Sequence, residues 1–160
     1  MATSMPAPGD PAPNFSAIDQ HGSSIDLESF AGKWVVLYFY PKDDTPGCTK
    51  EACNFRDHHP GLAELGAVVL GVSGDTAASH AKFAQKYDLP FSLLVDADRA
   101  MAKAYGAWGI KKNYGREYEG IIRSTFIISP EGTVAKRWAT VKPAEHGAEV
   151  LQWLKANASS

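Results

Sequence analysis

The 160-residue sequence predicts an α/β fold, a three-layer sandwich in which helices cover both faces of a mixed β-sheet. The apolar runs at residues 34–40 and 67–73 show no polar alternation, which indicates strands that are buried on both faces. Stretches with helical periodicity follow these runs. Near the C-terminus two strand-like segments precede a last helix, so parallel and antiparallel pairs should share one sheet.

The bulk composition is that of one ordinary globular domain. Hydrophobic residues make up 44% of the chain and charged residues 21%. We expect a single domain over residues 1–160, with the Pro- and Ala-rich residues 1–13 as a loose lead-in. The net charge of −2 gives no electrostatic reason to expect binding to nucleic acid or to an anionic membrane. The start lacks the basic and apolar segments of a secretory signal, so we expect a cytoplasmic protein.

The first expected element is an N-terminal β-hairpin. Residues 14–18 and 24–27 have the character of short strands, and Gln20-His21-Gly22 lies between them as a turn. The apolar run 34–40 then forms the central strand of the sheet. Its length fits a strand and falls far short of a membrane span.

A helix is expected directly after this strand, over residues 46 to about 57. Thr45 is a residue type that caps helices, and Pro46 suits the first helical position. The segment His58-His59-Pro60 should break the helix, because an interior proline removes a backbone hydrogen bond. Residues 61–65 would then form another short helical turn.

The second half of the chain alternates strands and helices before it ends in a hairpin and a helix. The segment 106–120 is rich in Gly, Lys and Tyr, and we expect a long loop there, of the kind that tends to be functional or mobile. The expected elements are a strand at 67–73, a helix from Asp75 or Thr76 to about Tyr87, a strand at 91–95, a short helix at 99–105, the loop, hairpin strands at 124–128 and 133–139, and an amphipathic helix at 143–156.

The chain has two cysteines, Cys48 and Cys53. Cys48 falls in the first turn of the expected helix, where backbone N–H groups are unpaired and the helix dipole is positive. Such a site favours the thiolate, which is the nucleophilic form of cysteine. Two cysteines are too few for a disulfide-stapled scaffold, and no Cys/His spacing matches a zinc site. We therefore expect a reactive Cys48, and no metal or other cofactor.

The stretch around Cys48 resembles the active-site segment of the peroxiredoxins. Their signature Pro-x-x-x-Thr-x-x-Cys is carried here by Pro41, Thr45 and Cys48. The longer run is similar to the bacterioferritin comigratory protein subfamily, also called peroxiredoxin Q, and the resemblance covers nearly the whole chain. The further residues that carry it are Glu51, Ala52, Phe55, Arg56, Asp57, the segment 123–128 and Pro130-Glu131-Gly132.

The resemblance implies a thioredoxin-like fold and an antioxidant oxidoreductase, a thioredoxin-dependent peroxidase that reduces hydrogen peroxide and organic hydroperoxides. Cys48 would attack the peroxide and become a sulfenic acid, the first and reversible step of cysteine oxidation. Cys53 would resolve it as a redox-active intramolecular disulfide. Thioredoxin or a similar dithiol would then reduce the disulfide. We expect a monomer, with a dimer as the alternative.

The resemblance also assigns roles around Cys48. Pro41 would shield the thiolate and shape the pocket. Thr45 would hydrogen-bond the thiolate and the bound peroxide, and Arg123 would stabilise the thiolate and polarise the peroxide. Gly47 joins Thr45, Cys48 and Arg123 in the expected peroxide-binding set. Chemistry supports these roles, because a helix N-terminus and a guanidinium together supply positive charge at the cleaved O–O bond without a metal.

Supporting roles are expected for Glu51 and Tyr40. Glu51 lies one helical turn after Cys48 and could orient Arg123 or Arg56, with an ordinary surface carboxylate as the alternative reading. Tyr40 should pack near the pocket, with its hydroxyl within reach of the substrate. Arg56 is expected as an exposed helix charge, and His80 as a packed or half-buried side chain.

The spacing of the two cysteines adds a constraint on the resolving step. In an intact helix, five residues separate Cα atoms by roughly 9 Å and point the two side chains about 140° apart. A disulfide needs Cα atoms within ~7 Å. The helix must therefore unwind locally around residues 49–54 before the bond can form, and a short helix would allow this at low cost.

Other functions are open at this point. A thioredoxin-type disulfide oxidoreductase would need Cys-x-x-Cys, whereas four residues separate Cys48 from Cys53, and Arg123-Ser124 stands where thioredoxins place a proline before Thr125. A one-cysteine peroxidase would use an external resolving thiol, with Cys53 merely packed in the helix. A non-enzymatic binding or chaperone role would require Cys48 to be dispensable.

Overall fold

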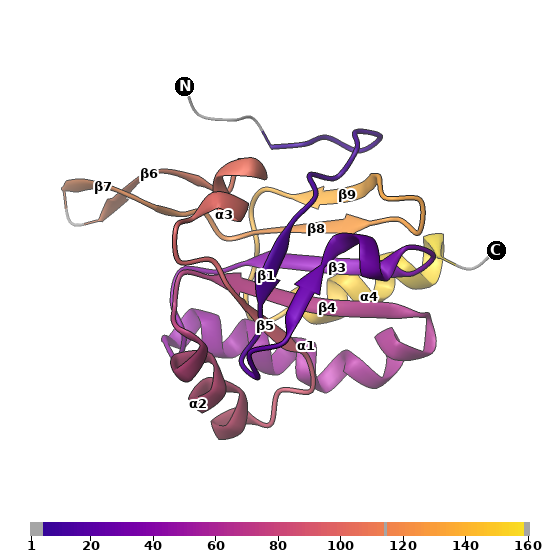
Figure 1. The fold of residues 1–160 in the computed structure, drawn as a ribbon, viewed down its shortest axis with the longest axis horizontal. Coiled ribbons are helices and arrows are strands. Elements are labelled where there is room, and N and C mark those ends of the chain that lie inside the picture. Colours follow the sequence, from indigo (N-terminus) through magenta and orange to yellow (C-terminus); the bar gives the residue numbers. More distant parts are fainter. Residues whose placement is uncertain (1–4, 114, 159–160) are drawn as a thin grey trace.

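The computed structural model describes residues 5–113 and 115–158, and its centre is a five-stranded mixed sheet (Figure 1). The strands β3, β4 and β5 run parallel, whereas β8 pairs antiparallel with β3 and β9 pairs antiparallel with β8. In spatial order they are β5 (Ser92–Val95), β4 (Ala67–Ser73), β3 (Trp34–Phe39), β8 (Ser124–Ile128) and β9 (Val134–Trp138). The apolar run at 34–40 thus forms the central strand, as predicted.

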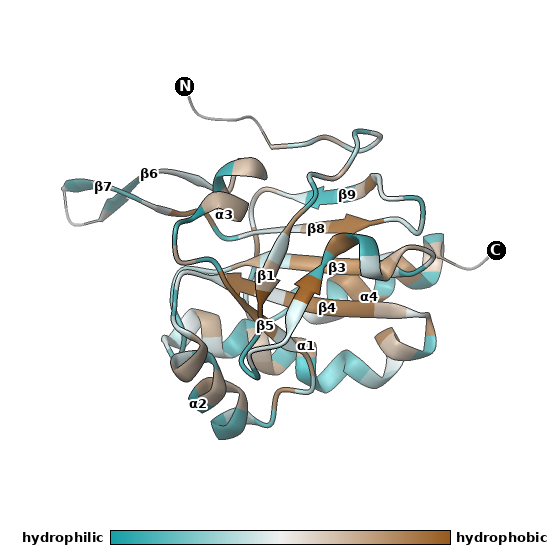
Figure 2. Cartoon of the chain, in the orientation of Figure 1, coloured by the Kyte–Doolittle hydropathy of each residue, from teal (hydrophilic) through white to brown (hydrophobic). Residues whose placement is uncertain are grey.

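Helices cover the two faces of this sheet unequally. Alternate β3 residues, Val36 and Tyr38, point to the face where α1, α2 and α4 pack. The other alternation, Val35 and Leu37, meets a thinner layer made by α3, the 3-10 turn η1 and Phe15. Figure 2 shows the brown, apolar strands enclosed between these layers. The helical elements are η1 (Leu27–Phe30), α1 (Pro46–Glu64), α2 (Ala77–Tyr87), α3 (Ala100–Ala104) and α4 (His146–Asn157).

The N-terminal hairpin is confirmed, with β1 (Ser16–Ile18) antiparallel to β2 (Ser24–Asp26). The Asp19 carboxylate holds its turn by accepting the backbone N–H groups of His21 and Ser23. Of the expected lead-in, residues 9–12 hydrogen-bond to the backbone at residues 132–134. Residues 1–4 lie outside the described part of the chain.

The helix after β3 is longer than its sequence predicted. α1 runs to Glu64 with Pro60 inside it, rather than ending near residue 57. Beyond Pro60, Leu62 is fully buried, and α4 packs so closely that a Cβ at Gly61 would lie 3.2 Å from Leu151. Packing of this second half against the core and α4 outweighs the hydrogen bond that proline cannot donate.

The prediction of a loop at residues 106–120 is also wrong. Strands β6 (Trp108–Asn113) and β7 (Arg116–Ile121) form an antiparallel hairpin that extends away from the sheet (Figure 1). Ile110 on this hairpin is 67% exposed and Tyr118 45%. Because a projecting hairpin has little buried face, its sequence lacks the apolar alternation that identifies a strand. Tyr114 is outside the described residues.

The other expected elements are confirmed to within a few residues. Thr76 caps α2, since its side chain accepts the backbone N–H of Ser79. On α4, Val150 and Leu154 are fully buried and Leu151 packs beside them, which is the inner face that the sequence predicted. Among the helices of the described residues, none is long and apolar enough to cross a bilayer.

Candidate active site

Cys48 lies where the sequence placed it, in the first turn of α1 just beyond the C-terminal end of β3. The first helical hydrogen bond runs from the N–H of Thr49 to the carbonyl of Thr45, at 2.8 Å. The N–H groups of Gly47 and Cys48 therefore precede the helical ladder, at the positive end of the dipole. The Cys48 side chain is almost closed off, with 1% of its surface exposed.

Arg123 reaches Cys48 from the neighbouring strand. It directly precedes β8, whose register pairs Ser124 with Phe39 at the end of β3. This register brings Arg123 to the edge of the sheet where the chain enters α1. Its Nη2 donates to Cys48 Sγ at 3.2 Å, and its Nη1 donates to Glu51 Oε1 at 2.6 Å. One guanidinium thus joins two acidic groups that lie one helical turn apart.

Glu51 is fully buried beside this guanidinium. Burial raises the pKa of Glu51 to about 7, although Arg123 acts in the opposite direction. Burial also disfavours the charge on Arg123, but Glu51 and Cys48 outweigh it and raise the pKa of the guanidinium. Of the two open readings of Glu51, the structure contradicts the surface carboxylate. It pairs Glu51 with Arg123, whereas Arg56 lies elsewhere.

Gly47 allows the guanidinium to come this close. A Cβ at this position would lie 3.2 Å from Arg123 Nη2, which is tighter than ordinary van der Waals contact. A larger residue at position 47 would therefore push Arg123 away from the Cys48 sulfur. Gly47 thus contributes by leaving room for the Arg123 guanidinium beside Cys48.

Thr45 does not cap the helix with its side chain, although its residue type suggested that it would. It occupies the N-cap position with extended backbone angles, but its hydroxyl donates to the carbonyl of Lys42 at 2.9 Å instead of capping the helix. A hydroxyl has one proton to donate, so in this conformation Thr45 does not donate to the Cys48 sulfur. Its bond to Lys42 closes the turn before α1. Pro41, at the start of this loop, is half-buried.

The family model for the AhpC/TSA family matches residues 8–137, which is most of the chain and includes Cys48 and Arg123. The chain belongs to the AhpC/TSA family. Peroxiredoxin Bcp of Bacillus subtilis is 52% identical over 147 residues, which cover 92% of this chain and 94% of the relative. The chain is therefore a peroxiredoxin of the bacterioferritin comigratory protein group, and it is a thiol-dependent peroxidase.

Solved structures confirm the thioredoxin-like peroxiredoxin fold. A variant of peroxiredoxin Q from Xylella fastidiosa superposes with a TM-score of 0.92 at 36% identity, over 98% of this chain and 100% of that one. Bacterioferritin comigratory protein of Xanthomonas campestris, solved as trapped intermediate and ligand complexes, gives 0.86 at 42% identity, over 91% and 92% of the two chains. The peroxide substrate and the thioredoxin-type reductant are those of the family.

A second buried cluster in this peroxiredoxin binds the hydroxyl of Tyr40. The Tyr40 hydroxyl donates to Asp43 Oδ1 at 2.5 Å, and the other oxygen of Asp43 binds His80 Nδ1 at 2.7 Å and the Ser79 hydroxyl at 2.8 Å. Tyr40 and His80 are both buried, so the expected packed histidine is confirmed. In this structure the Tyr40 hydroxyl is bonded inside the cluster, and its contact with substrate stays a prediction.

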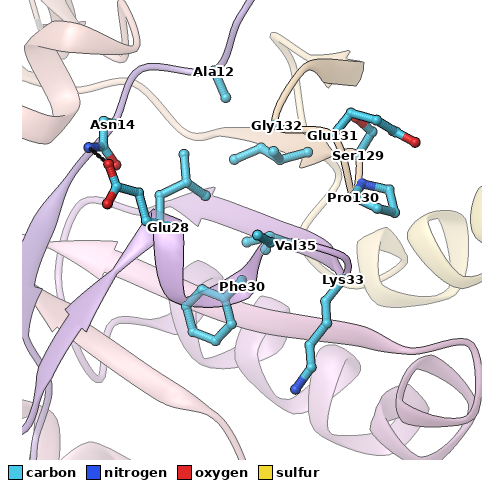
Figure 3. Close-up of a pocket in the computed structure, with 13 residues that line it drawn as sticks. Ala12, Asn14, Glu28, Phe30, Lys33, Val35, Ser129, Pro130, Glu131 and Gly132 are labelled. Carbon is cyan, nitrogen blue, oxygen red and sulfur yellow. Dashed lines mark hydrogen bonds between the residues drawn. The ribbon is translucent and has the colours of Figure 1, made fainter.

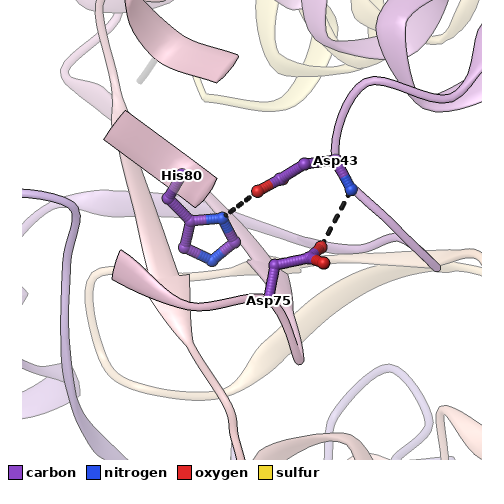
Figure 4. A group of neighbouring side chains, drawn as sticks. All are labelled: Asp43, Asp75 and His80. Carbon is purple, nitrogen blue, oxygen red and sulfur yellow. Dashed lines mark hydrogen bonds and ion pairs between the residues drawn. The ribbon is translucent and has the colours of Figure 1, made fainter. Parts of the chain in front are cut away.

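The cluster extends to Asp75, and Figure 4 shows Asp43 between Asp75 and His80. Asp75 Oδ2 accepts the backbone N–H of Asp43 at 2.8 Å and the Ser73 hydroxyl at 2.6 Å. The three side chains place possible metal-ligand atoms within 4.8 Å of one another. Hydrogen bonds already engage each of these side chains, so the cluster is explained as an anchor for the loop before α1.

The side chains of three further polar residues of α1, Arg56, Cys53 and Asn54, make no hydrogen bond with Cys48 in the described part of the chain. Arg56 donates to the carbonyl of Tyr87 at 2.8 Å and pairs with Asp57, so it ties α1 to the C-terminal end of α2. Cys53 is half-buried, and both cysteines are free on an intact helix. Asn54, the next residue, accepts the N–H of Ala148 at 3.0 Å and so caps the N-terminus of α4.

An apolar cavity of about 320 Å³ lies far from this chemistry (Figure 3). Val35 and Ile128 line it, and these two residues pair at the opposite end of β3 and β8 from Cys48 and Arg123. Leu27 and Phe30 of η1 add further apolar surface. The cavity therefore belongs to the packing between η1 and the sheet.

Proposed function

We propose that Cys48 is the peroxidatic cysteine and that it reduces hydrogen peroxide and organic hydroperoxides. The observation that carries this proposal is the 3.2 Å contact from Arg123 Nη2 to Cys48 Sγ at the start of α1. A thiolate in this position gains from both the guanidinium and the helix dipole. The Xanthomonas campestris relative, described by its alkyl peroxide reduction activity, supports organic hydroperoxides as substrates.

Peroxide reduction at Cys48 follows from the charges around it. The thiolate attacks the terminal oxygen of the peroxide, so an S–O bond forms while the O–O bond breaks. Arg123 stabilises the negative charge that moves onto the leaving oxygen. Gly47 supplies the space, and Pro41 and Thr45 hold the loop that borders the sulfur. In the complex with peroxide, the Thr45 hydroxyl leaves Lys42 and binds the substrate.

We propose Cys53 as the resolving thiol. It attacks the sulfenic sulfur of Cys48, and water leaves as the disulfide forms. Because the cysteines are free on an intact helix, the first turns of α1 must unwind for this step. Because α1 is long, a low free-energy cost of unwinding cannot come from a short helix. Unwinding of its N-terminal turns alone is sufficient to bring the two sulfurs together. Asn54, bound to α4, marks where unwinding stops.

We further propose a monomer that works in the cytoplasm. Among the described residues, the exposed large hydrophobic side chains are Ile18 and, on opposite faces of the β6–β7 hairpin, Ile110 and Tyr118. Side chains on separate faces do not make the continuous apolar patch of a stable dimer. A reducing compartment suits an enzyme whose disulfide must be opened by a thioredoxin-type dithiol in every cycle.

The test is thioredoxin-coupled peroxide consumption by the wild type and by Cys48→Ser and Cys53→Ser. Cys48→Ser should lose activity. Cys53→Ser should consume one equivalent of peroxide and then stall with thioredoxin, and mass analysis of the wild type should find a Cys48–Cys53 disulfide. Full turnover by Cys48→Ser would refute the proposed peroxidatic cysteine. Unchanged turnover by Cys53→Ser would refute only its resolving role and indicate an external thiol.

A further inference from the structure

Two acids share a single guanidinium in the active site. Arg123 contacts the Cys48 sulfur through Nη2 and Glu51 Oε1 through Nη1. The other carboxylate oxygen, Glu51 Oε2, is buried without a hydrogen-bond partner among the described residues. A buried carboxylate that lacks partners is costly in its charged form. With both acids ionised, the site would hold two negative charges against one positive charge.

The other titratable groups near the site are engaged with other partners or stay neutral. Lys111 donates to the carbonyl of Ile121, and burial, together with Arg123, lowers its pKa, whereas Cys48 raises it. Burial raises the pKa of Tyr38, and Glu51 and Cys48 raise it further, so its hydroxyl stays neutral. Asp43 adds a negative charge to the surroundings of Tyr38.

His146, on the α4 side, also stays neutral. Burial lowers its pKa, although Glu149 acts in the opposite direction, and its Nε2 is bonded to Thr125. A single proton shared between Cys48 and Glu51 balances the charge of Arg123, which bonds both acids.

We propose that Glu51 is the proton carrier of peroxide reduction, taking up the proton that Cys48 releases and giving it to the leaving oxygen. This inference rests on the proposed role of Cys48. Cys48 and Glu51 are three residues apart on α1, and the two Nη atoms of one guanidinium hold them, so the sulfur and the carboxyl group meet at Arg123. With a pKa of about 7, Glu51 can both accept and release a proton near neutral pH.

The proton and electron balance closes without any further reactant. The Cys48 thiol passes its proton to the Glu51 carboxylate. The thiolate electron pair forms the S–O bond to the terminal oxygen of the hydroperoxide, and the O–O electron pair leaves on the alkoxide or hydroxide. Glu51 then protonates that oxygen, which departs as alcohol or water. The sulfur is oxidised to sulfenic acid, the peroxide is reduced, and Glu51 returns to its ionised form beside Arg123.

The test compares two peroxides that differ in their need for a proton. The alkoxide that leaves tert-butyl hydroperoxide is a strong base and must be protonated, whereas the acetate that leaves peracetic acid is a weak base and needs no proton. In Glu51→Gln, the amide oxygen can still accept from Arg123, but the side chain carries no transferable proton. We expect its rate constant with tert-butyl hydroperoxide to fall about 10²-fold, as for loss of a general acid. The rate constant with peracetic acid should remain nearly unchanged.

Glu64→Gln is the matched control, because Glu64 is an exposed residue at the other end of α1. It should react with both peroxides like the wild type. Equal losses with both peroxides in Glu51→Gln would show that Glu51 only positions Arg123, and no loss with either would show that it does nothing. Either result overturns the proton carrier while leaving Cys48 as the peroxidatic cysteine. Peroxidase activity in Cys48→Ser would instead overturn the proposed function itself.

A measurement on the wild type covers the case in which Glu51→Gln folds poorly. The ratio of the rate constant for tert-butyl hydroperoxide to that for peracetic acid, corrected for ionisation of the peracid, is followed against pH. It should fall as the pH rises through about 7, where Glu51 loses its proton. A ratio that stays flat through this range would overturn the proposal.

Discussion

Two buried ionic clusters lie on either side of the loop that leads into α1, and they differ in how completely their atoms are partnered. Both oxygens of the Asp43 carboxylate are hydrogen-bonded, and both ring nitrogens of His80 have partners. In the cluster around Arg123, by contrast, one oxygen of Glu51 has no partner among the described residues, and the guanidinium contacts the sulfur of Cys48.

The difference separates an anchor from a site of chemistry. His80 contacts the Asp43 carboxylate through one ring nitrogen and the carbonyl of Leu94 through the other, so both ring nitrogens are already engaged. A network in which every polar atom has a hydrogen-bond partner can hold a loop in place, but it has no proton free for transfer. The group around Arg123 holds fewer protons than its acids could bind, which is the condition that proton transfer requires.

We call the group of Arg123, Cys48 and Glu51 the open cluster, and the group around Asp43 and His80 the closed cluster. The largest expected effect comes from removing Arg123, the cation of the open cluster. Arg123→Met should slow the reaction of reduced enzyme with hydrogen peroxide by about 10³-fold, because the thiolate and the leaving oxygen both lose their positive partner. Stopped-flow kinetics without any reductant measures this step directly. Arg116→Met, on the exposed strand β7, is the control and should react normally. A loss below about tenfold, or roughly 1.4 kcal/mol, would contradict the assigned role.

The closed cluster should respond in stability instead. Asp43→Asn replaces an oxygen that accepts from His80 or from Tyr40 by an NH₂ group, which cannot accept. We expect the free energy of unfolding to fall by about 3 kcal/mol, as when one partner of a buried pair is removed. Urea unfolding measures the change. Asp44→Asn, at the exposed neighbouring position, should alter stability little, and a similar loss in both variants would remove the distinction between the clusters.

A third effect comes from the raised pKa of Glu51. The value is about 7 in the folded protein and 4.5 for an unperturbed carboxyl group, so the folded state binds this proton more tightly. The resulting stability is fully present below the unfolded pKa and is lost as the pH rises through about 7. The loss amounts to at most about 3 kcal/mol.

Urea unfolding at several pH values measures this dependence in a Cys48→Ser background, where the sulfur no longer titrates. Adding Glu51→Gln to the same background should abolish the Glu51 contribution. If the stability of the two variants followed pH identically, Glu51 would not titrate in this range. The open cluster would then lack the exchangeable proton that distinguishes it from the closed one.

The smallest expected effect concerns the part of α1 that carries Cys53. Asn54→Ala removes the acceptor for the N–H of Ala148 and should cost about 1 kcal/mol of stability, as for other helix caps. Because the end of the unwinding segment is then less firmly held, the Cys48–Cys53 disulfide should form faster after peroxide addition. Quenched-flow thiol alkylation followed by mass analysis gives the rate. An unchanged rate would mean that Asn54 does not limit the unwinding.

Sequence reasoning succeeded where one local pattern determined the outcome. The apolar run of β3, the position of Cys48 in a first helical turn and the cap at Thr76 each follow from a few neighbouring residues. It failed where distant contacts override a local rule. Pro60 is a helix breaker by its own chemistry, but the contact of Gly61 with Leu151 of α4 and the burial of Leu62 keep the helix intact around it.

The same limit applies to the candidate site. The motif located Pro41, Thr45, Cys48 and Arg123, but residue types alone do not show which acceptor the Thr45 hydroxyl chooses, and it chooses Lys42. Burial of Glu51 and its unpartnered oxygen depend on the packing of α1 against the sheet. A signal for the Asp43–His80 pair did exist, because His80 shares a helix face with apolar residues and a buried imidazole needs a polar partner.

Arg123 and Cys48 are 75 residues apart in sequence, and this separation has a consequence for the life of the chain before it is folded. During synthesis Cys48 leaves the ribosome well before Arg123 has been added. Until β8 pairs with β3, the sulfur lacks the guanidinium that lies beside it in the folded site. Folding therefore switches on the sensitivity to oxidant, and a nascent or misfolded chain is spared the damage that its finished site would attract.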